Sequence, residues 1–214
     1  MIILNITNYN KSEFINELFD SLYNQVKDAE DIRINWIDDG STDNSVEVAS
    51  AHPLAALPFF KIIKHESNKW VAASRNTGLA EINKGDWITY IDGDDRVKPH
   101  YIEMLRKYVA DGKYDVYVYD YDLIPAYEDT SVQDVEKGLN LMTWSRLYRA
   151  DLILNHNISF DEEGFKEQGY GEDAKFNEII TALTDKIIDT RDVIYEYRWG
   201  VKGSLALIAT EKIH

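Results

Sequence analysis

Three aspartates lie close together directly after an apolar segment near the middle of the chain. The apolar segment covers residues 87–91, and Asp92, Gly93, Asp94 and Asp95 follow it. Carboxylates crowded at the end of a buried strand repel one another unless a cation lies among them, and oxygen ligands favour hard ions such as Mg2+ or Mn2+. Such ions keep positions open for phosphate oxygens, so the cluster points to an enzyme that handles a nucleotide diphosphate. An acidic turn is an equally good interpretation of the cluster alone.

Two polar stretches earlier in the chain offer groups that could bind a nucleobase. Thr7 and Tyr9 lie at the end of an apolar segment, and Asp38 and Asp39 follow another one. The Tyr9 ring could stack on a base, and the Asp39 carboxylate could accept the ring N–H of uracil. Tyr9 could equally belong to the rim of the core, and Asp39 could be a helix N-cap or a turn residue.

Further candidates lie on a predicted helix and in the last third of the chain. Arg75 is a cation among many acids, where it could support a ligand pocket or form a salt bridge with one of the aspartates. Glu172 and Asp173 precede a predicted helix. One of these carboxylates could be a general base on a flexible loop, or it could be a helix cap. Trp199 belongs to a segment of rings and cations that could clamp a diphosphate, stack on a sugar, or end a solvated strand.

The apolar pattern predicts a scaffold in which strands alternate with helices. We expect strands at 2–7, 32–37, 59–63 and 87–91, and helices after a capping-box pattern at Asn10 and Glu13, around Val46, and at 72–82. This alternation indicates an α/β protein with a mainly parallel central sheet flanked by helices. Ligands of open α/β sheets bind beyond the carboxyl ends of the strands. The polar stretches should therefore converge on one crevice.

The pattern is less regular after Pro99. We expect the following elements there: a helix at 101–109, a strand at 116–119, a polar loop at 125–140, a helix at 141–154, a short strand at 158–160, a mobile loop at 161–172, a helix at 174–183, and strands at 187–188 and 193–197. The simplest organisation is a single domain over 1–214. Its nucleotide-sugar-binding half would be 1–98 and its acceptor-binding half 99–214.

Composition narrows the class of protein. The 214 residues are 44% apolar, include 14 Tyr and 5 Trp, and contain no Cys, which excludes disulfides and thiolate metal sites. The formal net charge of −15 disfavours broad nonspecific binding to nucleic acid. We find no signal peptide and no apolar run of membrane-spanning length, so we expect no transmembrane segment and a cytoplasmic location, in the host cytoplasm if the source is a phage.

Several segments, in this order, resemble the family 2 glycosyltransferases, which have the GT-A fold. The resemblance runs from about residue 2 to residue 204, and the segment 37–43 (Ile-Asp-Asp-Gly-Ser-Thr-Asp) is its most specific part. The other matching segments are 6–10, 72–80, 85–95 (the DxD strand), 144–149 and 171–176. Two positions depart from the family pattern: Thr7 stands where Pro is usual, and Trp70 stands where a small residue, often Gly, is usual.

The resemblance implies an inverting, metal-dependent transfer of a sugar from a nucleotide diphosphate donor, most often a UDP-sugar, to an acceptor hydroxyl. It implies Mn2+ or Mg2+ as cofactor. For the acceptor we expect a glycan or glycolipid, while a protein and, less favoured, a modified DNA base stay open. The implied donor-binding residues are Tyr9, Asp38, Asp39, Arg75 and Asp92. Beside these we expect Thr7, Gly93 and Trp199 to bind the donor, because they lie in the polar stretches and the ring-rich segment described above. The implied metal ligands are Asp92 and Asp94, and the implied catalytic base is Asp173.

Two alternatives remain to be weighed. A sugar nucleotidyltransferase shares this type of sheet but needs a glycine-rich basic loop after the first strand, where this chain has Asn8, Tyr9, Asn10 and Lys11. A non-catalytic nucleotide-sugar-binding module would not need an intact set of Asp92, Asp94 and Asp173. Both alternatives are therefore less favoured than the transferase.

Overall fold

The computed structural model describes residues 1–128, 130, 142–168 and 171–202. In the first half, each of the first three parallel strands is followed by a helical connection, and the fourth is followed by a short strand. The elements of this half are β1 (Ile2–Asn8), α1 (Ile15–Val26), β2 (Ile32–Asp38), α2 (Ser45–Ala51), the 3-10 helix η1 (Pro53–Ala56), β3 (Phe60–Lys64), α3 (Trp70–Leu79), β4 (Trp87–Asp92) and β5 (Arg96–Val97). The predicted alternation is therefore confirmed over this half.

The second half adds strands that complete the sheet and helices that cover it. Its elements are α4 (Tyr101–Asp111), β6 (Val116–Pro125), the 3-10 helix η2 (Thr143–Ser145), β7 (Arg146–Arg149), α5 (Ala150–His156), α6 (Glu162–Gln168), α7 (Glu172–Leu183) and β8 (Ile187–Trp199). No helix in the described ranges is long and apolar enough to span a bilayer.

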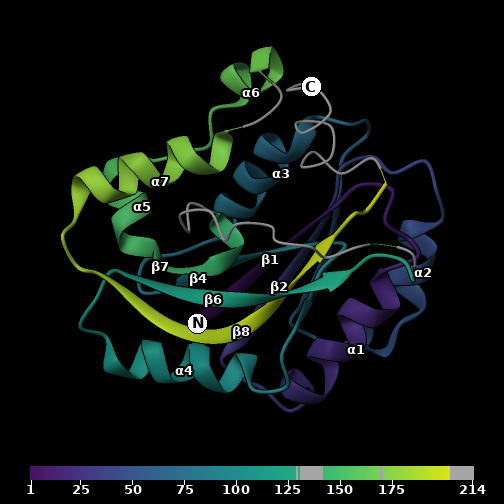
Figure 1. The fold of residues 1–214 in the computed structure, drawn as a ribbon, viewed down its shortest axis with the longest axis horizontal. Helices are drawn as coiled ribbons and strands as arrows, with labels where there is room; N and C mark the ends of the chain where they lie inside the picture. Colours follow the sequence, from purple (N-terminus) through teal and green to yellow (C-terminus); the bar gives the residue numbers. More distant parts are fainter. Residues whose placement is uncertain (129, 131–141, 169–170, 203–214) are drawn as a thin grey trace.

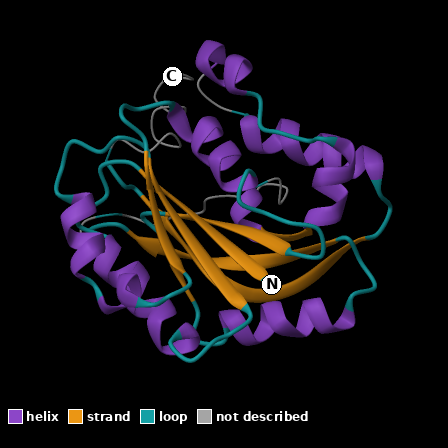
Figure 2. Ribbon diagram, turned by 180° about the vertical axis from the view of Figure 1, so that it is seen from behind, coloured by secondary structure: helices purple, strands orange, loops and turns teal. Residues whose placement is uncertain are grey.

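The described strands form one twisted sheet with the order β3-β2-β1-β4-β7-β6-β8-β5. The strands β3, β2, β1 and β4 are mutually parallel, β7 is antiparallel to both of its neighbours, and β6 and β8 are parallel. Helices cover both faces: α1 and α4 lie on one side and α3, α5 and α7 on the other (Figures 1 and 2). The architecture is a three-layer α/β sandwich, which confirms the predicted fold class.

Each face of the sheet has its own core because side chains alternate along a strand. From β1, Leu4 and Ile6 pack with α1 and α4, whereas Ile3 packs with α3, α5 and α7. All seven residues of β1 are buried, although three of them, Asn5, Thr7 and Asn8, are polar. Burying one such aliphatic side chain stabilises the fold by roughly 1.5–3 kcal/mol.

Four local predictions are wrong. Asn10 does not cap α1, which begins at Ile15; instead its side-chain oxygen accepts hydrogen bonds from the N–H groups of Thr42 (2.8 Å) and Asp43 (3.2 Å). Residues 158–160 form no strand, because the Asn76 side chain accepts the N–H of Phe160 (2.8 Å) and donates to its carbonyl (3.0 Å) in place of a neighbouring strand. A local pattern cannot reveal either long-range contact.

The other two errors concern residues 141–172. The described part of the predicted helix 141–154 forms η2 and β7 before α5 begins, because β7 pairs with both β4 and β6. The predicted loop 161–172 contains α6, which buries Phe165 and begins where Asp161 accepts the N–H of Gly164 at 3.1 Å. Residue 141, residues 169–170 and most of the predicted loop 125–140 lie outside the described residues.

Candidate active site

The carboxyl ends of three parallel strands meet at one edge of the sheet. In the strand registers, Thr7 is opposite Asp92 and Asn8 is opposite Asp38. The Thr7 hydroxyl donates to Asp92 Oδ1 at 3.2 Å, and the N–H of Gly93 donates to the Thr7 carbonyl at 2.8 Å. A Cβ atom at position 93 would lie 2.8 Å from that carbonyl oxygen, so only glycine allows the turn to approach β1 this closely.

Arg75 of α3 joins the end of β4 to the start of α7. Its Nη1 donates to Glu172 Oε1 at 2.7 Å and also to Asp173 Oδ1, and its Nη2 lies 3.4 Å from Asp92 Oδ1. The Arg75 side chain is only 3% exposed. The three carboxylates raise the pKa of Arg75 although burial opposes this, so the guanidinium remains charged.

Asp173 is buried at the start of α7 and has a second anchor. The Thr143 hydroxyl donates to its Oδ1 at 3.0 Å, and the Thr143 N–H donates to its Oδ2 at 3.3 Å. Burial raises the pKa of Asp173 to about 7, with smaller contributions from the negative charges of Glu172 and Asp92, while Arg75 opposes the shift. This carboxyl group therefore changes protonation state near neutral pH, as a general base does.

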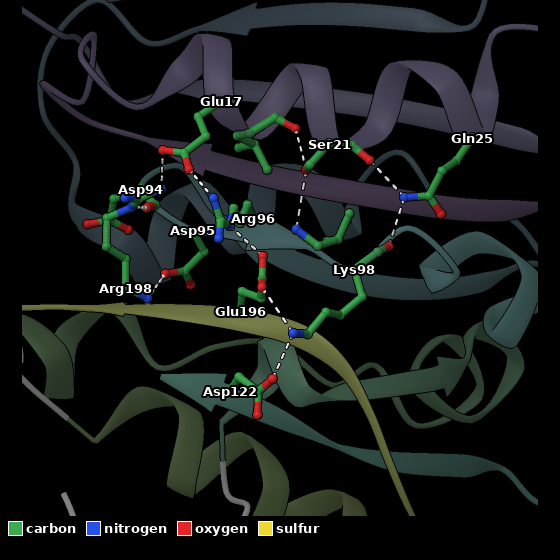
Figure 3. A network of polar contacts seen from close by, with 12 residues as sticks. Glu17, Ser21, Gln25, Asp94, Asp95, Arg96, Lys98, Asp122, Glu196 and Arg198 are labelled. Atoms are coloured by element: carbon green, nitrogen blue, oxygen red, sulfur yellow. Dashed lines mark hydrogen bonds and ion pairs between the residues drawn. The ribbon is translucent and has the colours of Figure 1, made fainter. Parts of the chain in front are cut away.

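The side chains of the aspartate turn point in different directions. Burial raises the pKa of Asp92, with a further contribution from Asp94, and Asp94 Oδ2 lies 2.7 Å from the Lys11 ammonium. Asp95 is fully buried and faces β8: its carboxylate accepts the Tyr195 hydroxyl and the N–H of Arg198, each at 2.7 Å. Figure 3 shows Asp94 and Asp95 beside Arg198, whose Nε donates to the Asp94 carbonyl at 2.6 Å.

Asp38, the last residue of β2, and Asp39, which follows it, have hydrogen-bond partners of their own. Asp39 Oδ1 interacts with His65 Nδ1 at 2.7 Å and accepts the N–H of Lys69 at 2.8 Å. Asp38 Oδ1 accepts the Asn8 side-chain amide at 3.0 Å. Both carboxylates are buried, whereas the Tyr9 side chain is exposed. The structure thus holds Asp38 and Asp39 rigidly, and their role in base binding stays a prediction.

Trp199 lies apart from the cluster around Arg75. It ends β8, where its carbonyl accepts the N–H of Ala126 at 2.9 Å and its ring centroid lies 6.5 Å from that of Tyr197. Of the predicted residues, the hydrogen-bonded network joins Thr7, Arg75, Asp92, Gly93 and Asp173. It does not include Tyr9 or Trp199 among the contacts of the described residues.

Three participants had not been identified from the sequence: Lys11, Thr143 and His65. Lys11 belongs to a polar stretch directly after the first strand, and this position is the local signal that could identify it. Thr143 and His65 carried no local signal, because they reach their aspartates from segments 30 and 26 residues away in the chain. Only the fold brings them together.

The chemistry of the cluster fits a hard divalent cation. Asp92 and Asp94 provide only oxygen donors, which Mg2+ and Mn2+ prefer. The described residues contain no group of three or more His, Cys, Asp or Glu side chains arranged to hold a metal. A cationic group already lies against Asp94, namely the Lys11 ammonium.

Comparison with known proteins gives the family. The profile of Glycosyl transferase family 2 matches residues 4–167. Glycosyltransferase GlyA of Streptococcus pneumoniae is 26% identical over 229 residues, an alignment that covers 95% of this chain and 31% of GlyA. The chain therefore belongs to glycosyl transferase family 2, and it spans about a third of that relative.

Solved structures agree on the fold. S. aureus TarS in complex with UDP-GlcNAc superposes with a TM-score of 0.79 at 18% identity, covering 96% of this chain and 60% of TarS. The mannosyltransferase PcManGT from Pyrobaculum calidifontis, in complex with GDP-Man and Mn2+, gives a TM-score of 0.68 at 15% identity, covering 94% of this chain and 58% of that protein. The fold is thus the GT-A fold.

Proposed function

We propose that this chain is a metal-dependent, inverting glycosyltransferase that moves a sugar from a UDP-sugar to an acceptor hydroxyl. The observation that carries the proposal is the buried cluster at the strand ends, where Arg75 holds Asp92, Glu172 and Asp173 together. Family membership supports sugar transfer, and the structural neighbours TarS and PcManGT were solved with nucleotide sugars bound.

In the proposed reaction, Asp173 is the general base. The acceptor oxygen attacks the anomeric carbon from the face opposite the diphosphate, and the bond from that carbon to the diphosphate oxygen breaks. The acceptor proton passes to Asp173, and the nucleoside diphosphate leaves. Asp173 has a free acceptor position for this proton, since a carboxylate accepts about four hydrogen bonds and Arg75 and Thr143 fill three.

Asp92 and Asp94 would hold the divalent cation, Mn2+ or Mg2+. When bound, that ion supplies Lewis-acid neutralisation of the charge that develops on the leaving diphosphate. Thr7 and Gly93 fix the turn that carries the two carboxylates. The carboxylate oxygens of Asp92 and Asp94 are the type of ligand that a hard cation bound to a nucleotide diphosphate requires.

Asp39, supported by Asp38 and beside Tyr9, would recognise uracil by accepting its ring N–H. Support comes from the rigid position of the Asp39 carboxylate, whose Oδ1 is already engaged by His65 and Lys69. Its other oxygen would accept from the base. We propose a glycan or glycolipid hydroxyl as acceptor, with a nucleic-acid acceptor disfavoured by the net charge of −15.

Thermal-shift measurements with UDP, GDP and dTDP, each with and without Mn2+, test the donor. UDP with Mn2+ should raise the melting temperature most, because a ligand of the native state stabilises it by mass action. Asp94→Ala should remove most of the Mn2+-dependent part. Stabilisation by GDP without stabilisation by UDP would refute uracil recognition at Asp39, and stabilisation by none of the three would refute the donor class.

A further inference from the structure

Lys11 makes a contact that the proposed reaction does not explain. It lies between β1 and α1, and its Nζ is 2.7 Å from Asp94 Oδ2. The two side chains are only 15% and 14% exposed, and the Nζ atom itself is inaccessible to solvent. Among the described residues, Asp94 is the only acidic partner of this ammonium. An ammonium has three N–H donors, so one carboxylate oxygen leaves capacity for further acceptors.

The backbone that carries Lys11 is fixed, so the contact is not the result of a loose loop. Asn10 adopts a left-handed conformation (φ 52°) and binds the N–H groups of Thr42 and Asp43 through its side chain. The N–H of Lys11 donates to Ser45 Oγ at 3.3 Å. The four-carbon side chain of Lys11 can therefore move its ammonium while the main chain stays in place.

The charges around the Lys11 ammonium indicate its role in the site. Arg75 lies against Asp92, and Lys11 lies against Asp94, so each of these two carboxylates has one cationic neighbour. A divalent cation on Asp94 would compete with Lys11 for the same oxygen. A diphosphate that arrived with that cation would offer the displaced ammonium new anionic oxygens nearby, which is the type of acceptor that lysine binds as a point charge.

We propose that Lys11 is a donor-binding residue that pairs with Asp94 only while the site is empty, and that transfers to the diphosphate when donor and cation bind. This inference rests on the proposed function. It predicts that loss of the Lys11 ammonium changes the affinities for the cation and for the diphosphate in opposite directions. Removing the ammonium frees Asp94 for the cation but deprives the diphosphate of a partner.

The experiment compares wild type with Lys11→Met, which keeps the aliphatic stem, and with Lys11→Arg, which keeps the charge. Binding of Mn2+ alone is measured from the electron paramagnetic resonance signal of the free ion, and binding of UDP is measured by calorimetry at saturating Mn2+. Lys107→Met serves as the matched control, because Lys107 is exposed on α4 and its loss changes the net charge equally.

We expect Lys11→Met to bind Mn2+ about tenfold more tightly and UDP about tenfold more weakly, since each effect corresponds to one charge-assisted contact. Lys11→Arg should retain most of the UDP affinity, and Lys107→Met should match wild type. Circular dichroism and the melting temperature establish that each variant is folded. If Lys11→Met is unfolded, Lys11→Gln replaces it.

Two outcomes overturn the inference while the proposed function stands: unchanged UDP affinity in Lys11→Met, or Mn2+ binding that is no tighter than in wild type. If wild type itself binds no UDP at saturating Mn2+, the proposed donor fails first, and the inference fails with it. The wild-type titration therefore separates the two failures.

Discussion

Two charged regions flank the aspartate turn, and they differ in how their charges are balanced. We call the first the crevice cluster; its members are Lys11, Arg75, Asp92, Asp94, Glu172 and Asp173. We call the second the β8 network; its members are Glu17, Arg96, Lys98, Asp122, Glu196 and Arg198 (Figure 3). Apart from the turn residue Asp95, whose buried carboxylate accepts two hydrogen bonds from β8, the β8 network has three carboxylates that face three cations. In the crevice cluster four carboxylates face two cations.

Burial makes this difference meaningful. Four of the six side chains of the β8 network are 24–51% exposed, so water screens their charges, whereas Glu196 and Arg198 are 13% and 6% exposed. Those of the crevice cluster are only 3–26% exposed. Unbalanced buried carboxylates are costly and shift the pKa of their members upward. A balanced network needs no ligand, whereas a buried excess of negative charge supports the proposal that a cation binds there.

The turn at residues 92–95 belongs to both regions. Its Asp92 and Asp94 side chains enter the crevice cluster, while the Asp94 carbonyl and the Asp95 carboxylate are bound by Arg198. Burial, with the charges of Asp94 and Asp92, raises the pKa of Asp95 well above its usual value. The β8 side thus holds the backbone of the turn, which leaves the crevice side chains available for ligands.

The largest expected effect separates catalysis from stability at Asp173. Asp173→Asn keeps the shape and can still accept hydrogen bonds, but it cannot take the acceptor proton. Sugar transfer should fall by about 10²–10⁴-fold, which is what a positioned general base contributes, while UDP binding survives. Transfer to the acceptor, measured with radiolabelled donor, and the melting temperature together check this expectation.

Glu172→Gln is the matched control, because Glu172 contacts the same Arg75 nitrogen. We expect a much smaller loss of transfer in this variant. Near wild-type transfer by Asp173→Asn, with a large loss in Glu172→Gln, would assign the base to Glu172 instead. Losses of equal size in both variants would indicate that the two carboxylates act through the position of Arg75.

The first half of the chain was predictable from sequence because its signals are local. Strands β1, β2 and β4 are apolar runs followed at once by polar residues, and the parallel α/β pattern brings their ends together. The strand ends that carry Thr7, Asp38 and Asp92 therefore meet as the sequence indicated, although the roles of these residues stay predictions. Gly93 was identified from its motif, and the structure adds the reason, since a Cβ there would press on Thr7.

The second half was harder because long-range contacts decide its elements. Trp144, Leu147 and Tyr148 have helical spacing, yet pairing with β4 and β6 makes β7 a strand. The three glycines of 161–172 suggested a loop, but burial of Phe165 stabilises α6. Thr143 belongs to η2, which precedes β7 where a helix was predicted, so local spacing could not have revealed its hydrogen bonds to Asp173.

A second prediction uses pH to test the burial of Asp173. Its pKa is raised to about 7, so kcat/KM should fall about tenfold for each pH unit below that value, as the free enzyme loses its base. A pH profile of kcat/KM with saturating Mn2+ measures this. A profile that is flat between pH 5 and 8 would contradict an essential base with this pKa.

The raised pKa of Asp173 also predicts in which direction the stability of the protein changes with pH. An acid whose pKa is raised on folding binds more protons in the native state than in the unfolded state between about pH 4 and pH 7, so its contribution to stability is lost as pH rises through that window. Wild type should therefore lose stability relative to Asp173→Asn between pH 5 and pH 8. Urea unfolding at several pH values, with both proteins in the same buffers, tests the sign.

A third prediction concerns backbone strain beside the crevice cluster. Trp70, the first residue of α3, has φ 73° and is 49% exposed, with its ring centroid 6.1 Å from that of Phe165. A left-handed conformation costs a residue with a Cβ about 1–2 kcal/mol. Trp70→Gly should therefore be more stable than Trp70→Ala by about that amount, since both variants lose the ring and only glycine relieves the strain.

The control reverses this sign. At Ala110, an exposed position within α4, substitution by glycine should reduce stability by up to about 1 kcal/mol, as in an ordinary helix. Chemical denaturation of the three variants and wild type gives the comparison. Equal stability of Trp70→Gly and Trp70→Ala would show that the left-handed conformation at this position carries no cost.

The smallest expected effect is in the β8 network. Arg96 pairs with Glu17 and Glu196, but its side chain is 34% exposed, and Arg198 and Lys98 also contact those two acids. Arg96→Gln should therefore reduce the free energy of unfolding by less than about 1 kcal/mol, and by less still in 1 M salt, where exposed ion pairs are screened. Transfer activity should stay at the wild-type level, because Arg198 still holds the Asp94 carbonyl.

Urea unfolding at low and high salt, beside the transfer assay, measures both quantities. A salt-independent loss of several kcal/mol, or a loss of transfer comparable to that of Asp173→Asn, would show that the β8 network is not the passive support that its balanced charges indicate.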